Sequence, residues 1–254
     1  MKAVVLAAGY ATRLGALGDS GAKALLEVGG RPVLDHLVDR LRPLAGLAEL
    51  VLVTNDRFHA DFVRWAGARD RPFPVRLVND GTRANAERRG GIADLALAVA
   101  EALRDGPTDL LVAAGDNLLG FDLAEFAAAF GRLGRPLVLA RRLPDAVPPR
   151  RHGEIVAGAD GRILSFREKP DDPRSPLAAA CVYAFPAAVR EHLAAYLAAG
   201  GDRDAPGHFL AWLVARTPVH VHVAPAPIHD IGDPASLAAA RQAFGAPIRT
   251  RPLE

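Results

Sequence analysis

The sequence predicts an α/β fold, in which a mostly parallel central sheet is flanked by helices and carries a mixed β/α insert. The first observation is that short apolar runs alternate with amphipathic helical patterns through residues 1–144. This alternation is typical of a parallel sheet with helices on both faces. The second is that 50% of the 254 residues are hydrophobic, which supports a substantial core. The third is a change of pattern after residue 144, where the strand-like runs no longer alternate regularly with helices.

The first part of the chain contains apolar runs of strand length. We expect strands at 3–8, 50–54, 74–79, 109–115 and 136–141. The amphipathic patterns around them predict helices at 32–44, 57–67, 91–104 and 122–131. Pro32 opens the first of these helices, since proline is well tolerated in the first turn.

The second part of the chain predicts a mixed arrangement. The stretch "RHGEIVAGADGRILSFREKP" (151–170) indicates an antiparallel pair, with "ADG" as its turn. Further elements are expected, in chain order, as a strand at 178–186, helices at 187–199 and 208–216, a strand at 219–225 and a closing helix at 233–244. We expect Asp233 to cap that last helix, with Pro234 at its first position. We interpret residues 1–254 as one domain with halves at 1–144 and 145–254.

Charge and cysteine usage exclude several classes of protein. The 31 basic and 29 acidic residues leave a net charge of +2, which is too small to indicate a nucleic-acid binder. A single cysteine, Cys181, excludes an internal disulfide framework. No stretch approaches the ~18 apolar residues of a spanning helix, so we expect no membrane partner. These features predict a cytoplasmic protein.

Open α/β sheets bind ligands beyond the carboxyl ends of their strands. The first such loop, "LAAGYATRL", offers small residues at Ala7, Ala8 and Gly9, where backbone N–H groups can approach a ligand closely. Arg13 and Lys23 bring two cations to the same loop, as a polyphosphate requires. From spacing alone, a surface loop with solvated cations is an equal alternative.

A resemblance to a known family decides between these readings. The stretch "LAAGYATRLGALGDSGAKALLEVGGRPVLDH" is similar to the signature of the sugar-1-phosphate nucleotidyltransferases, of which the glucose-1-phosphate thymidylyltransferases are one branch. Ala11 stands where that signature usually has glycine, and Ala22 where it has proline. The resemblance implies a Rossmann-like nucleotide-diphospho-sugar transferase fold, with nucleotide bound by residues 1–144 and sugar phosphate by residues 145–254.

The same resemblance implies roles for the opening loop. The backbone of Leu6, Ala7, Ala8 and Gly9 would meet the base and ribose. Arg13 would grip the triphosphate, and Lys23 would face the α-phosphate and the incoming sugar phosphate. Only three lysines occur in the chain, at Lys2, Lys23 and Lys169, and two of them fall in these motifs.

Two aspartates are candidate metal ligands. Asp116 follows an apolar strand in "LLVAAGDN", and Asp230 precedes a glycine turn in "HDIGDP". Magnesium usually takes one or two carboxylates together with phosphate oxygens and water. The resemblance implies that Asp116, also a catalytic residue, and Asp230 hold Mg²⁺ together. The alternative is that both are turn or capping residues.

The motif "FREKP" contains the candidate sugar-phosphate site. In the related family this E-K-P pattern implies that Glu168 binds sugar hydroxyls and that Lys169 binds the sugar's phosphate. It also implies that Gly153 allows close backbone approach beneath the sugar. An exposed Glu–Lys pair at a strand end is the alternative. Cys181 replaces the glycine of a related G-x-Y pattern, which predicts a narrower or reshaped sugar pocket.

Base selection is expected within "NDGTRANAERRGGIADLALAV" (79–99). Asn79 or Asp80 is placed to read the base, since an amide such as that of Asn79 offers both a donor and an acceptor. Gly91 could lie against the base, and Asp94 begins the next helical turn. This segment departs most from the related pattern.

These features predict transfer of a nucleotidyl group from an NTP to a sugar-1-phosphate, with release of pyrophosphate. We favour dTTP or UTP as donor, with CTP or GTP possible, and a homo-oligomer is possible. The alternatives are a cytidylyltransferase or similar enzyme acting on a non-sugar or cyclitol phosphate, and a catalytically silent nucleotide-sugar sensor.

Overall fold

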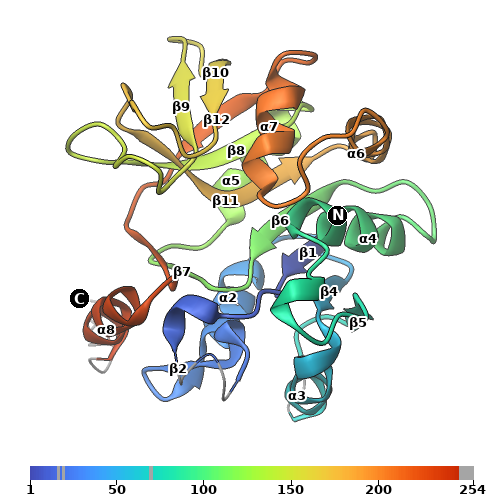
Figure 1. Cartoon of the computed structure of the whole chain (residues 1–254). Helices are drawn as coiled ribbons and strands as arrows, with labels where there is room; N and C mark the ends of the chain where they lie inside the picture. The colour runs from blue at the N-terminus through green and yellow to red at the C-terminus, as the bar shows by residue number, and fades with distance from the viewer. Residues whose placement is uncertain (16–17, 19–20, 69–70, 246–254) are drawn as a thin grey trace, which may run out of the picture.

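A computed structural model describes residues 1–15, 18, 21–68 and 71–245, and its arrangement is shown in Figure 1. The described residues form one nine-stranded sheet in the order β10-β9-β11-β6-β1-β4-β5, in which β8 also pairs with β11 and β12 pairs with β8. The main-sheet strands are β1 (Lys2–Leu6), β4 (Leu50–Thr54), β5 (Val75–Asn79), β6 (Leu110–Ala114), β8 (Leu137–Arg142), β9 (Glu154–Ala157), β10 (Ile163–Arg167), β11 (Leu177–Phe185) and β12 (His220–Val223). Two small pairs lie outside it, β2 (Glu27–Val28) with β3 (Arg31–Pro32) and β7 (Asn117–Leu119) with β13 (Ile228–Asp230).

The predicted fold class is confirmed. Strands β6, β1, β4 and β5 run parallel, and β11 joins β6 in the antiparallel sense. One sheet therefore continues from the first half of the chain into the second. The helices are α2 (Val33–Leu41), α3 (Asp56–Gly67), α4 (Gly91–Ala102), α5 (Ala124–Leu133), α6 (Val189–Ala198), α7 (Pro206–Val214) and α8 (Pro234–Phe244).

The helices cover both faces of the sheet because side chains alternate along its central strand. In β1, Ala3 and Val5 point into a core shared with α2, α3 and α5. Val4 points the other way, into a core shared with α4, α6 and α7. All three side chains are fully buried. The carboxyl ends of the parallel strands therefore form a rigid edge of the sheet, because helices pack on both of its faces.

A third, smaller cluster fixes the closing helix α8 at that edge. Leu237 of α8 packs with Ile231, Leu118 and Leu14, and each is at most 2% exposed. Asp233 caps the helix as predicted: its Oδ1 accepts a hydrogen bond from the Ser236 backbone N–H at 2.8 Å.

Several elements differ from those expected. The sequence did not predict the short strands β2, β3, β7 and β13, since two- and three-residue strands carry no readable periodicity. The helix expected to end at residue 44 ends at Leu41, and the one expected to end at 104 ends at Ala102. In the described part of the chain, no helix is both long and apolar enough to cross a membrane.

Candidate active site

The loop after β1 leaves its backbone open to a ligand. Nothing lies within 4 Å of the position that a side chain at Gly9 would take. Ala11 adopts a left-handed backbone with a φ of 54° and packs, buried, in the same cluster as Leu14. A left-handed conformation costs a residue other than glycine about 1–2 kcal/mol. This cost explains why glycine suits the position that Ala11 occupies.

A pocket of about 360 Å³ lies over this loop. Its lining includes five of the six predicted nucleotide-binding residues, namely Leu6, Ala7, Ala8, Gly9 and Gly91. It is also lined by the predicted catalytic and phosphate-binding residues Arg13, Lys23, Asp116 and Lys169. Residues that are far apart in the sequence thus meet in one cavity of nucleotide-compatible size.

The structure does not bring Asn79 to this pocket. Its Nδ2 donates to Asp56 Oδ1 at 2.7 Å, and its Oδ1 accepts from the Gly81 backbone N–H at 2.8 Å. Both ends of the amide are therefore used within the β5–α3 corner, at an exposed position. Asp80, the alternative at this place, is buried beneath the pocket.

A buried hydrogen-bonded chain runs from the opening loop to Asp80. Tyr10 donates its hydroxyl proton to Thr82 Oγ1 at 2.7 Å, and Thr82 Oγ1 donates to Asp80 Oδ1 at 2.8 Å. The Thr82 backbone N–H donates to the same oxygen at 2.7 Å. This chain ties the loop that carries Tyr10 to the segment before α4.

Asp94, in the first turn of α4, faces Asp80 and lines the pocket. Burial, and then repulsion by Asp80, raise the pKa of Asp94 to about 7. Its Oδ1 is buried and has no hydrogen-bond partner among the described residues. Protonation of Asp94 removes the repulsion between the two carboxyl groups.

A second pair of carboxylates lies at the centre of the cleft. Asp116 lies between β6 and β7, and Asp230 ends β13, which pairs with β7 so that Asp230 lies opposite Asn117. The Ile231 backbone N–H also donates to the Asp116 carbonyl oxygen at 3.1 Å. The β7–β13 pairing therefore brings the two predicted metal ligands together.

The two carboxylates repel each other, and Lys23 offsets part of their negative charge. Lys23 Nζ lies 3.0 Å from Asp116 Oδ2. Asp230 is open to the pocket, but desolvation by the cleft walls and then repulsion by Asp116 raise the pKa of its carboxyl group. Two facing carboxylates with open coordination positions fit Mg²⁺, which takes its other ligands from phosphate and water. Among the described residues, no three His, Cys, Asp or Glu side chains gather into a metal site.

The predicted sugar-phosphate residues also lie together. A side chain at Gly153 would approach Glu168 Oε2 to 3.1 Å, and one at Gly207 would approach it to 1.8 Å. Burial raises the pKa of Glu168. Lys169 Nζ lies 3.7 Å from Glu168 Oε1, and the backbone of Lys169 is left-handed with a φ of 44°. Two glycines thus create the space that Glu168 fills.

The model of the family described as "Nucleotidyl transferase" matches residues 2–245. The chain belongs to this family. It is 31% identical over 204 residues to a glucose-1-phosphate thymidylyltransferase of Streptomyces griseus, covering 77% of this chain and 52% of that protein. It is 29% identical over 189 residues to the UTP–glucose-1-phosphate uridylyltransferase AglF of Haloferax volcanii, covering 74% of this chain and 73% of the relative.

Solved structures of similar fold cover almost the whole chain. A crystal structure described as a putative glucose-1-phosphate thymidylyltransferase from Bacillus anthracis superposes with a TM-score of 0.82 at 22% identity, covering 96% of this chain and 95% of the other. A UDP-glucose pyrophosphorylase complexed with UDP-glucose gives a TM-score of 0.78 at 18% identity, covering 96% and 97%. The chain spans about half the length of some curated relatives, 52% in the Streptomyces griseus protein.

Cys181 departs from the family pattern at a constrained position. Its backbone is left-handed, with a φ of 50°, where the register of β11 against β8 shifts. Burial raises the pKa of its thiol to about 12, so the thiolate that a nucleophile needs is not formed near neutral pH. Beside it, Asn117 Nδ2 donates to the Ala180 carbonyl oxygen at 2.7 Å and fixes β7 against β11.

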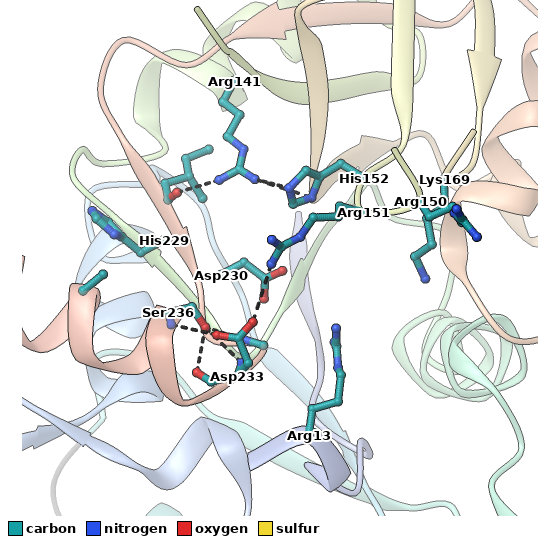
Figure 2. A pocket seen from close by; sticks show the side chains of 13 residues that line it. Arg13, Arg141, Arg150, Arg151, His152, Lys169, His229, Asp230, Asp233 and Ser236 are labelled. Carbon is teal, nitrogen blue, oxygen red and sulfur yellow. Dashed lines mark hydrogen bonds and ion pairs between the residues drawn. The ribbon is translucent and has the colours of Figure 1, made fainter. Parts of the chain in front are cut away.

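Sequence reasoning missed a basic wall of the cleft. A pocket of about 470 Å³ next to Asp230 is lined by Arg13, Arg141, Arg151, His152 and Lys169, among others (Figure 2). Arg141 and His152 also line a cavity of about 230 Å³ that reaches Asp116 and Cys181. No motif marked Arg141, because it stands in the ordinary strand pattern of β8 and acquires its place only through the fold.

Proposed function

We propose that this family member transfers a nucleotidyl group from an NTP to a sugar-1-phosphate, releasing pyrophosphate. The observation that carries the proposal is the position of Lys23 and the Asp116–Asp230 pair. Arg13, Lys23 and Asp116 line both the pocket over the opening loop and the cavity that leads to Asp230. A donor in the first pocket and an acceptor in the second would meet at these residues.

The chemistry needs positioning and neutralisation of charge more than it needs a protein nucleophile. Lys23 lies beside the pair and can contact the α-phosphate, where negative charge accumulates as the acceptor oxygen attacks. Arg13 lines all three cavities and can orient the leaving pyrophosphate. A Mg²⁺ ion held by Asp116 and Asp230 would supply further charge neutralisation on the phosphates.

On the acceptor side, Lys169 is placed to bind the acceptor's phosphate, and Glu168 to accept hydrogen bonds from hydroxyl groups. Lys169 lines both the nucleotide pocket and the basic pocket, so it can reach the junction between them. The names of the relatives, which specify glucose-1-phosphate with dTTP or UTP, favour these donors for the first test.

The test is a matrix of dTTP, UTP, CTP, GTP and ATP against a panel of sugar-1-phosphates, with Mg²⁺ present and pyrophosphate release as the readout. We expect release with at least one pairing and its loss with EDTA. A protein that binds nucleotide-sugar tightly but releases no pyrophosphate with any pairing would be a sensor, and the proposal would be wrong.

A further inference from the structure

The basic pocket contains more positive charge than its own acids neutralise. Of its cations, Arg150 lies 3.2 Å from Asp171, and Arg151 lies 3.5 Å from Asp233. Arg141 differs from both, because it has no ion pair among the residues that the structure describes. Lys169 lies 3.7 Å from Glu168 Oε1. Arg13 has no ion pair among the described residues either, but the proposed function assigns it to the triphosphate. Arg141 is therefore the cation of this wall that is left for another anion.

Arg141 is held firmly by neutral partners. Its Nη1 donates to the Ile228 carbonyl oxygen at 3.1 Å, and its Nη2 donates to His152 Nε2 at 2.8 Å (Figure 2). Burial lowers the pKa of Arg141, and Asp230 acts in the opposite direction. Asp230 also interacts with Asp116 and Lys23, so its negative charge does not neutralise Arg141 alone. A half-buried guanidinium supported only in this way retains free capacity to bind an anion.

His152 supports the same orientation as an acceptor. Arginine can only donate hydrogen bonds, so the nitrogen of His152 that meets it carries no proton. Burial, followed by the charges of Arg141, Arg151 and Lys169, lowers the pKa of His152 to about 4. The imidazole is therefore neutral at physiological pH and adds no positive charge of its own.

Arg141 also lies away from Lys169, the residue that is proposed to bind the acceptor's phosphate (Figure 2). That phosphate has to reach Lys23 and Asp116, and Lys169 lines the pocket that contains both. In Figure 2, Arg141 and His152 lie above Asp230, whereas Lys169 lies well to one side. Arg141 lines the adjoining cavity of about 230 Å³, which shares Lys23, Asp116 and Cys181 with that pocket. An acceptor bound through its phosphate would direct the rest of its body into this cavity.

We propose that Arg141 binds a second anionic group on the acceptor, so that the preferred acceptor is a sugar-1-phosphate that also carries a carboxylate or a second phosphate. A guanidinium matches either group with two parallel hydrogen bonds. This inference rests on the proposed nucleotidyl transfer and specifies the class of acceptor.

Three acceptors that share the ring configuration of glucose test the inference, namely glucose 1-phosphate, glucuronic acid 1-phosphate and glucose 1,6-bisphosphate. With the best NTP, we expect at least one of the two acceptors that carry an additional anionic group to show a kcat/KM at least about tenfold above that of glucose 1-phosphate. This ratio corresponds to about 1.4 kcal/mol. Comparison of glucuronic acid 1-phosphate with glucose 1,6-bisphosphate shows whether the protein prefers a carboxylate or a second phosphate. An equal or higher value for glucose 1-phosphate would overturn the inference, with nucleotidyl transfer itself still established.

Two variants locate the effect. Arg141→Gln should lose the preference, and a melting temperature close to that of wild type shows that the variant is folded. Arg142→Gln, at the next and exposed position of β8, should keep the preference because successive side chains of a strand point to opposite faces. A preference that survives Arg141→Gln would overturn the assignment to Arg141.

A binding measurement covers the case in which no pairing releases pyrophosphate. Calorimetric titration of the three acceptors into the Mg²⁺ and NTP-analogue complex should show the same order of affinity and the same loss in Arg141→Gln. Identical affinities for all three would overturn the inference independently of turnover.

Discussion

The two buried carboxyl groups of Asp80 and Asp94 predict an unusual dependence of the protein's stability on pH. Asp94 has a folded-state pKa of about 7 against an ordinary value of 3.8, because burial and the neighbouring Asp80 disfavour its ionised form. Between about pH 4 and pH 7 the folded protein therefore holds a proton that the unfolded chain releases. Stability from this group falls as the pH rises through that window, and the full penalty is present above about pH 7.

The substitution Asp94→Asn removes the penalty with almost no change of shape. Raising a pKa from 3.8 to about 7 corresponds to at most about 4 kcal/mol, and relaxation around Asp80 reduces what is observed. We expect Asp94→Asn to be more stable than wild type by about 2 kcal/mol at pH 8, and to differ little at about pH 4. The amide of the new residue can also donate to Asp80.

Urea denaturation at a series of pH values between about 4 and 8.5 measures this difference. Asp80→Asn serves as a second variant, because loss of its charge should lower the pKa of Asp94 and shift the window downward. A difference between Asp94→Asn and wild type that does not change with pH would show that Asp94 is ionised in the folded protein, and the reasoning would be refuted.

Three further substitutions test the cleft. Lys23→Met should keep the melting temperature near that of wild type and reduce pyrophosphate release about 10²–10³-fold, because a cation aimed at the α-phosphate is lost; near-normal turnover would remove Lys23 from the mechanism. Gly207→Ala would place a methyl group 1.8 Å from the present position of Glu168 Oε2, so the carboxylate must move. We expect a higher acceptor KM with an unchanged NTP KM, and equal effects on both would contradict this division of the cleft. Asp230→Asn should abolish the rise in melting temperature on adding MgCl₂, and a full rise would place the metal elsewhere.

The sequence predicts local elements well because the burial pattern of each element is repeated along it. The strand expected at 50–54 is β4, with the same bounds, and all five of its side chains are buried. The placement of Asn79 failed for a reason that periodicity cannot show. Asn79 does end β5 as expected, but the start of α3 brings Asp56 within 2.7 Å of its amide. A competing partner on a neighbouring helix is a property of packing.

The two departures from the related pattern that replace a glycine have a common physical basis. The resemblance identified Ala11 and Cys181 as replacements of glycine, and both residues have a left-handed backbone, with φ values of 54° and 50°. The fold therefore keeps the conformation that glycine serves and accepts the strain of a side chain. At Cys181 the added side chain lines the cavity of about 230 Å³ that is proposed to take the acceptor.

The position of the second carboxylate depends on packing that the motif "HDIGDP" does not itself reveal. Asp230 reaches Asp116 through the three-residue strand β13, which is too short to hold its register alone. Its register is held by packing on either side: Ile231 is fully buried beside Leu237 of α8, and Asp233 caps the same helix. The closing helix therefore holds Asp230 in place and so fixes the distance between two carboxylates that repel each other.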